Sequence, residues 1–157
     1  MCKRFSRTVV AALVVGVALA ALVSAEAKNP RLGKWKLKSD APPPAINIMT
    51  YEPFGTGGMK VTVESKNAEG RETKWTYTTM FDAKDEPVTG HPSADTTSVK
   101  KIDDRTTEIV NKKAGRVLQI ITNVISEDGR TINNTYKNFD AEGKPTRTTT
   151  AVYERIQ

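Results

Sequence analysis

Apolar and polar side chains alternate in short runs through most of the chain after Leu32, and these runs are rich in threonine and other β-branched residues. Alternation with a period of two is typical of strands that bury one face and expose the other. Turn residues interrupt the runs at short intervals, and no apolar stripe of helical period is seen. The pattern therefore predicts an all-β fold with nine antiparallel strands, at residues 34–39, 46–52, 59–66, 72–81, 96–102, 106–112, 116–126, 131–138 and 145–155.

Glycine-containing turns of similar sequence separate the later strands. Gly115, Gly129 and Gly143 follow one another at intervals of 14 residues, which is the length of one strand plus one turn. This spacing predicts an up-and-down meander, whose connections alternate between the two ends of the sheet. We expect one end to hold the connections at 40–45, Gly70, 103–104 and Gly129, and the other end to hold those at 54–58, 82–95, 115–116 and 143–144.

An antiparallel sheet of about 8–10 strands rarely stays open, because its twist accumulates and its exposed edges aggregate. We therefore expect the sheet to form a closed or nearly closed barrel. A two-sheet sandwich built from the same hairpins is the alternative.

The N-terminal residues resemble an export signal. Lys3, Arg4 and Arg7 precede an apolar, alanine-rich run at 9–23 that ends in small residues, so cleavage is expected after Ala25 or Ala27. The run is shorter than the roughly 20 residues of a spanning helix, so retention as a membrane anchor is the alternative. We expect residues 1–25 to be the signal peptide and residues 26–157 to form one domain, exported to a bacterial periplasm or to the exterior.

Charge and cysteine content narrow the function classes. The chain has 24 Lys and Arg against 18 Asp and Glu; removal of three basic residues with the signal lowers the net charge from +6 to +3. This small, dispersed surplus does not indicate a nucleic-acid partner. Outward lysines such as Lys34 and Lys60 argue against stable insertion of the barrel in a membrane. The only cysteine, Cys2, leaves with the signal, so no disulfide or thiolate site is expected.

Two short motifs resemble those of known barrel families. The tripeptide Gly33-Lys34-Trp35 resembles the G-x-W start of lipocalins. The lipocalin resemblance implies that the tryptophan closes the barrel and that an arginine, Arg155 or less well Arg147, packs over its ring.

The end of the chain resembles the last strand of fatty-acid-binding proteins, whose R-x-Y pair grips a carboxylate. Here Tyr153 matches the tyrosine, but Ala151 stands in place of the arginine. Taken whole, the chain looks closest to small exported bacterial lipocalin-like, or calycin-like, proteins of unknown function, although no helix pair is expected after the first strand or before the last.

The side chains expected on the inward face suggest a ligand-binding interior, because they combine an apolar wall with a few polar groups. We expect an exported soluble barrel that binds a small apolar or amphiphilic molecule and needs no cofactor. Alternatively, the same side chains fill the barrel, which is then a non-enzymatic structural or protein-interaction module of the cell envelope. The side chains are Trp75, Tyr77, Phe81, Ile132, Asn134, Tyr136 and Tyr153, with Gln119 or Asn123 as further polar contacts.

The segment at 85–96 contains the only histidine, His91, flanked by prolines and preceded by Asp85 and Glu86. One imidazole with scattered carboxylates lacks the ligand set of a zinc site, and the acids lack the spacing of a calcium loop. His91 is also the only imidazole base, and no serine lies in a nucleophile elbow. We therefore expect neither a metal site nor catalysis here. The segment is interpreted as a rigid crossover that, together with Phe54, forms a rim or lid of the barrel.

Overall fold

The computed structural model describes residues 29–43 and 45–157. The expected signal peptide and both expected cleavage sites lie outside the described residues. The described chain forms ten strands: β1 (Gly33–Leu37), β2 (Ile46–Phe54), β3 (Gly58–Lys66), β4 (Glu72–Thr79), β5 (Asp82–Pro87), β6 (Thr96–Lys101), β7 (Thr106–Lys113), β8 (Arg116–Ile125), β9 (Thr131–Phe139) and β10 (Pro145–Arg155).

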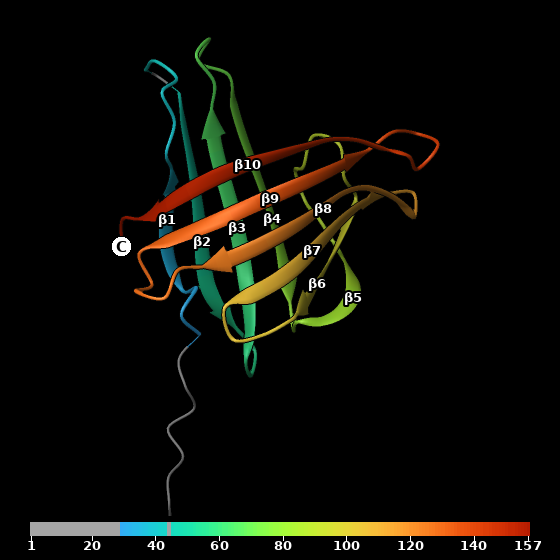
Figure 1. Ribbon diagram of the computed structural model, residues 1–157, viewed down its shortest axis with the longest axis horizontal. Helices are drawn as coiled ribbons and strands as arrows, with labels where there is room; N and C mark the ends of the chain where they lie inside the picture. The colour runs from blue at the N-terminus through green and yellow to red at the C-terminus, as the bar shows by residue number, and fades with distance from the viewer. Residues whose placement is uncertain (1–28, 44) are drawn as a thin grey trace, which may run out of the picture.

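All ten strands belong to one antiparallel sheet of order β4-β3-β2-β1-β10-β9-β8-β7-β6-β5. The first and last strands of the chain are therefore neighbours, and Trp35 on β1 lies opposite Arg155 on β10. The sheet curls until its two edge strands, β4 and β5, approach each other (Figure 1). This confirms the predicted all-β meander in a nearly closed barrel, with one curved sheet rather than a two-sheet sandwich.

The seam between β4 and β5 is bridged by the β5–β6 loop. Thr76 of β4 and Thr89 of the loop exchange two backbone hydrogen bonds, with N–O distances of 2.9 and 3.0 Å. Next to this bridge, Gly90 has a φ of 80°, and a Cβ atom at this position would overlap the carbonyl oxygen of Lys74. Glycine is therefore required where the loop crosses the edge of β4.

The prediction of one long loop at 82–95 is wrong, because its first half forms the edge strand β5. This strand is mostly exposed and lacks an apolar face, as edge strands often do. It also begins with a bulge, marked by the positive φ of Phe81 and Ala83, so its polar sequence gives no alternation signal.

Because β5 is an additional strand, every connection after it lies at the opposite end of the barrel from the end that the sequence predicted. The upper end holds the connections after β1, β3, β5, β7 and β9, whereas the lower end holds those after β2, β4, β6 and β8. Figure 1 shows the β3–β4 turn at the top and the β2–β3 turn at the bottom. The turns at 103–104 and Gly129 thus lie at the lower end with 55–57. The loop at 88–95 lies at the upper end with 40–45, contrary to the expected grouping.

The lower end is closed by Trp35, whose side chain is completely buried. The indole Nε1 donates to the Arg31 carbonyl at 2.8 Å, and the Arg155 guanidinium carbon lies 4.1 Å from the ring centroid. Arg155 also donates to the Leu32 and Gly129 carbonyls, both at 2.8 Å. These contacts tie β1, β10 and the β8–β9 turn together. Arg147, the other candidate for this contact, is exposed.

Candidate functional site

An interior cavity of about 200 Å³ lies inside the barrel, above the closed lower end. Its wall comes from seven strands on both sides of the barrel, because the inward positions of each strand face the same space. The lining side chains are Asn47, Met49, Tyr51, Val61, Val63, Trp75, Tyr77, Ile109, Asn111, Ile121, Asn134, Tyr136 and Tyr153.

Among the described residues that line the cavity, no side chain carries a charge at neutral pH. Burial raises the pKa of Tyr51, Tyr77 and Tyr153 far above the ordinary range of a phenol, so all three remain protonated. The polar groups of the cavity are thus neutral hydroxyls and carboxamides set in an aliphatic and aromatic wall. Such a lining favours uncharged ligands, because an ionised group loses its hydration there without gaining a counter-ion.

A directed chain of hydrogen bonds leads from the lower end to the cavity. Arg31 Nε donates to Asn123 Oδ1 at 3.1 Å, and Asn123 Nδ2 donates to Asn134 Oδ1 at 2.8 Å. Asn134 Nδ2 then donates to the Tyr136 hydroxyl oxygen at 3.0 Å. Since this oxygen accepts from Asn134, its own hydrogen is available to an acceptor in the cavity.

A second chain of hydrogen bonds follows another part of the wall. Thr97 Oγ1 donates to Asn111 Oδ1 at 2.9 Å, and Asn111 Nδ2 donates to Gln119 Oε1 at 3.2 Å. Gln119 Nε2 continues the chain to Asn138 Oδ1 at 2.8 Å. The Asn111 carboxamide thus has both a donor and an acceptor partner within the protein, which fixes its orientation.

Asn47 differs from the other polar side chains of the cavity. Its Oδ1 is buried and has no hydrogen-bond partner among the described residues. Asn47 also lines an adjoining depression of about 410 Å³ under the β1–β2 connection at the upper end. An unsatisfied buried acceptor costs about 1–3 kcal/mol, so a ligand with an N–H or O–H group gains by binding next to it.

Five of the seven residues expected to bind ligand line the cavity: Trp75, Tyr77, Asn134, Tyr136 and Tyr153. The other two residues do not line it. Ile132 is completely buried in the core and does not line the cavity. Phe81 lies after the end of β4, where the chain turns with positive φ, and it lines a different pocket at the lower end.

The expected rim does not assemble at one end of the barrel. Phe54 lies at the lower end and is 43% exposed. Asp85 and Glu86 belong to β5. Both carboxylate oxygens of Asp85 accept hydrogen bonds from Lys112 Nζ, at 2.7 and 2.8 Å. His91 lies at the upper end. The missed strand β5 explains this error, since it places Phe54 and His91 at opposite ends.

His91 packs edge-on against Trp75, with ring centroids 4.9 Å apart, so it covers a residue that lines the cavity. Its Nδ1 accepts hydrogen bonds from the backbone N–H groups of Ser93 and Ala94, at 3.1 and 2.9 Å. Partial burial lowers the pKa of His91. The imidazole therefore fastens the β5–β6 loop over the seam in its neutral form. Within the described ranges, no three His, Cys, Asp or Glu side chains cluster as metal ligands do.

The sequence interpretation missed part of the wall. Asn47, Met49 and Tyr51 share the inward face of β2, and the alternation along that strand was sufficient to find them. Arg31 precedes the first strand and belongs to no periodic pattern, yet only 3% of its surface is exposed. Only the folded structure reveals its position.

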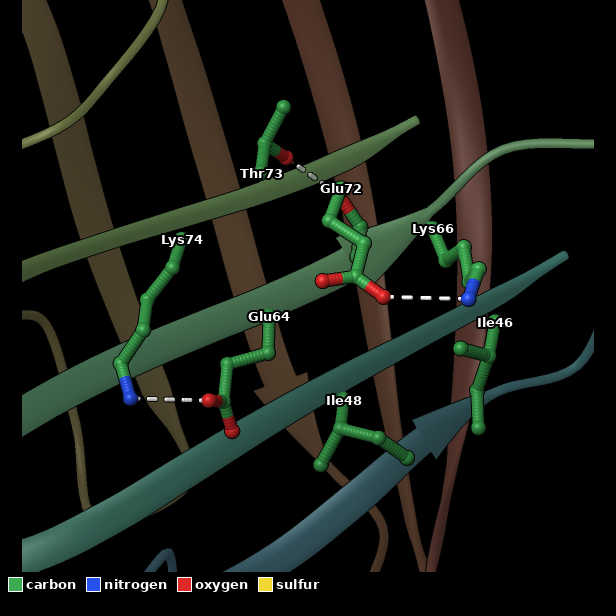
Figure 2. A pocket seen from close by; sticks show the side chains of 8 residues that line it. Ile46, Ile48, Glu64, Lys66, Glu72, Thr73 and Lys74 are labelled. Atoms are coloured by element: carbon green, nitrogen blue, oxygen red, sulfur yellow. Dashed lines mark hydrogen bonds and ion pairs between the residues drawn. The ribbon is translucent and has the colours of Figure 1, made fainter. Parts of the chain in front are cut away.

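A shallow depression of about 410 Å³ on the outer face of β2, β3 and β4 is a weaker candidate. Figure 2 shows that ion pairs cross it between β3 and β4: Lys74 to Glu64 at 2.9 Å and Lys66 to Glu72 at 3.0 Å. These outward side chains satisfy one another, and Ile46 beside them is 42% exposed. The depression is therefore the solvated outer surface of a strand pair.

No helix long and apolar enough to cross a bilayer occurs in the described part of the chain. The sequence matches no known protein family and no curated protein. Among solved structures, the fold is similar to the crystal structure of a mutant of the fluorescent protein UnaG. The TM-score is 0.54 at 12% sequence identity, and the match covers 82% of this chain and 97% of that chain. At this identity the likeness concerns the fold alone, a nearly closed antiparallel β-barrel.

Proposed function

We propose that this protein is an exported, non-enzymatic β-barrel that binds a small, uncharged and largely apolar molecule in its interior. The observation that carries the proposal is the neutral cavity with one unsatisfied acceptor, Asn47 Oδ1, in its wall. A calycin-like barrel is compatible with this function, since the interior of such a barrel is wide enough to hold one small ligand.

The size of the cavity limits the ligand. An apolar cavity of about 150 Å³ is large enough to hold benzene, whereas drug-sized ligands occupy roughly 300–1,000 Å³. The cavity here, at about 200 Å³, therefore suits a molecule with one or two small rings or a short chain. A long acyl chain requires more space than this interior provides.

The polarity of the cavity argues against an ionised ligand. In fatty-acid-binding proteins the R-x-Y pair neutralises a carboxylate, but Ala151 occupies the arginine position here and no lining residue is cationic. Burying an unpaired carboxylate is far more costly than burying a neutral carbonyl or amine. The sequence alone allowed any apolar or amphiphilic ligand. The cavity favours those amphiphilic ligands whose polar groups are uncharged.

Indole is a suitable probe, because it is neutral, bicyclic and carries one N–H donor. We expect the protein to bind indole in isothermal titration and to bind 1-methylindole more weakly. One hydrogen bond to Asn47 Oδ1 contributes about 0.5–1.5 kcal/mol, or roughly a 2- to 10-fold difference in Kd. Replacement Asn47→Leu should abolish this difference while the apolar contacts remain.

A matched pair of variants tests whether binding occurs in the cavity. Ile121→Phe places a larger ring in the cavity wall, whereas Thr122→Phe places the same ring on the exposed outer face of the same strand. We expect indole binding to be lost in Ile121→Phe and kept in Thr122→Phe. Circular dichroism must show folded protein in both cases, because overpacking a core costs about 1–3 kcal/mol.

Two results would contradict the proposal. If no uncharged probe binds and native mass spectrometry of protein from its own host detects no small molecule, the interaction-module hypothesis is favoured instead. If Thr122→Phe abolishes binding as fully as Ile121→Phe, the probe binds outside the cavity. The export part is tested separately by cell fractionation and N-terminal sequencing, with a mature terminus at residue 26 or 28 expected.

A further inference from the structure

A second pocket, of about 520 Å³, opens at the lower end of the barrel, and it shares no lining residue with the interior cavity. It lies between the segment before β1 and the turns that follow β2, β4 and β6. Its lining residues are Asn29, Pro30, Arg31, Gly57, Phe81, Lys101, Asp104, Arg105 and Thr107. From this pocket we infer that the lower end binds a small aromatic carboxylate, at a site separate from the interior.

Arg31 is the central observation, because it is a cation with only 3% of its surface exposed. Its Nε donates to Asn123 Oδ1, and its Nη2 donates to the carbonyl oxygens of Arg105 and Asn123. Within residues 29–43 and 45–157, Nη1 has no hydrogen-bond partner and no carboxylate forms an ion pair with the guanidinium. A buried charge of this kind is stabilised when an anion pairs with it.

Asp103 is the acid whose charge acts on Arg31, but its carboxylate is engaged elsewhere. The Asp103 carboxylate accepts the backbone N–H groups of Arg105 and Thr106 at 2.8 and 2.7 Å, and it thereby holds the β6–β7 turn. Burial lowers the pKa of Arg31, and the charge of Asp103 partly offsets this effect. Asp103 is thus engaged by the backbone of its own turn and forms no ion pair with Arg31 among the described residues.

Two further cations strengthen the field in the pocket. Lys101 and Arg105 line it together with Arg31. Among the described residues, Asp104 is the only carboxylate in the lining, and its Oδ1 pairs with Lys101 Nζ at 2.7 Å. The lining residues thus carry three positive charges against one negative charge. At Arg31 the Nε and Nη2 groups already donate within the protein, so a ligand carboxylate would accept from Nη1 with one oxygen and from Lys101 or Arg105 with the other. Two cationic donors side by side favour a two-oxygen anion over a spherical ion.

Phe81 supplies the apolar part of the pocket and the reason to expect an aromatic ligand. It is held at φ 60°, a conformation unfavourable for a residue with a large side chain, and its N–H donates to Thr79 Oγ1 at 2.9 Å. The ring packs against the edge of the core and also lines the pocket. Strained residues of this kind often belong to binding sites.

Benzoate is the probe, and benzyl alcohol of similar shape is its neutral counterpart. In ¹⁵N-labelled protein, benzoate should shift the backbone amides of Gly57, Phe81 and Arg105 and the Nε–Hε signal of Arg31. It should leave the backbone amide of Val63 unmoved, because Val63 lines the interior cavity and lies outside the hydrogen-bond chain that starts at Arg31. Benzyl alcohol should leave the lower-end signals unchanged. The lining of this pocket includes none of the residues that line the interior cavity. The two proposals are therefore tested independently: indole can fail to bind while benzoate binds, and benzoate can fail to bind while indole binds.

Charge variants at the pocket give a second readout. Lys101→Gln should weaken benzoate binding by roughly 3- to 10-fold, and Asp104→Asn should strengthen it by roughly 2- to 10-fold. Lys100→Gln is the matched control, since Lys100 is exposed on the same strand and does not line the pocket.

The proposal is overturned if benzoate shifts the cavity signals instead, or if benzyl alcohol shifts the lower-end signals as strongly. It is also overturned if Lys100→Gln weakens binding as much as Lys101→Gln, because benzoate then responds to overall charge alone.

Discussion

Gly90 offers the sharpest test of how the seam of the barrel is closed. Replacement Gly90→Ala has two separate effects, because the backbone at this position has a φ of 80° and an added Cβ would overlap the Lys74 carbonyl oxygen. The first effect is conformational and arises at any such glycine. The second is specific to the docking of the β5–β6 loop on β4.

Gly143 provides the matched control, because it has a φ of 79° and a Cβ atom there would meet nothing within 4 Å. Gly143→Ala should therefore cost only the left-handed backbone energy, about 1–2 kcal/mol. Gly90→Ala should cost this amount and also break the two backbone hydrogen bonds between Thr76 and Thr89, each contributing about 0.5–1.5 kcal/mol. The expected free-energy loss is thus about 2–5 kcal/mol for Gly90→Ala.

Urea unfolding measures both losses of stability, and amide hydrogen exchange locates them. In Gly90→Ala the Thr76 and Thr89 amides should exchange much faster than in the wild type, whereas in Gly143→Ala they should keep their protection. If the two variants lose stability equally, within about 0.5 kcal/mol, the loop is not docked on β4 and the seam is open in solution.

Two other predictions concern pH and barrel closure. The folded-state pKa of His91 is lowered by burial, so neutral His91 stabilises the fold above its unfolded pKa of about 6.5, and this contribution is lost as pH falls through the folded pKa. Urea midpoints between pH 7 and pH 5 should fall more for wild type than for His91→Phe, and parallel curves would contradict this. Arg155→Lys loses the guanidinium donors to three backbone carbonyls, those of Gly129, Leu32 and Pro30, and should destabilise the protein by about 1–3 kcal/mol. Arg147→Lys at an exposed site should change stability by less than about 0.5 kcal/mol, and equal urea midpoints for the two variants would refute the closing role of Arg155.

Side-chain alternation was sufficient to predict those parts of the fold where one face of a strand is apolar. Trp75 and Tyr77 on β4 and Asn134 and Tyr136 on β9 reach the cavity because a period of two places them on the inward face. The antiparallel meander and the near closure of the barrel follow from the same pattern and the regular turns. These features are local in sequence, so a single chain carries enough information to find them.

The errors arise where tertiary contacts replace periodicity. β5 is a polar edge strand, and it becomes recognisable only through its pairing with β6, where Glu86 lies opposite Thr97. Missing one strand shifts every later connection to the wrong end, which is why Phe54 and His91 were grouped together. Phe81 was assigned to the inward face because its left-handed backbone has no signature in the sequence.

The two proposed sites have opposite polarity, and the buried Arg31 explains how they coexist. A guanidinium can only donate hydrogen bonds, so Asn123 must turn its carbonyl oxygen toward Arg31 and its NH₂ group toward Asn134. Asn134 is then oriented in the same sense, and the Tyr136 hydroxyl receives the last donor. The positive charge thus remains at the lower end. The cavity wall carries two neutral groups, a hydroxyl donor at Tyr136 and an unsatisfied acceptor at Asn47. A neutral ligand that carries both a carbonyl and an N–H group complements these two groups, whereas an anion is better accommodated beside Arg31 itself.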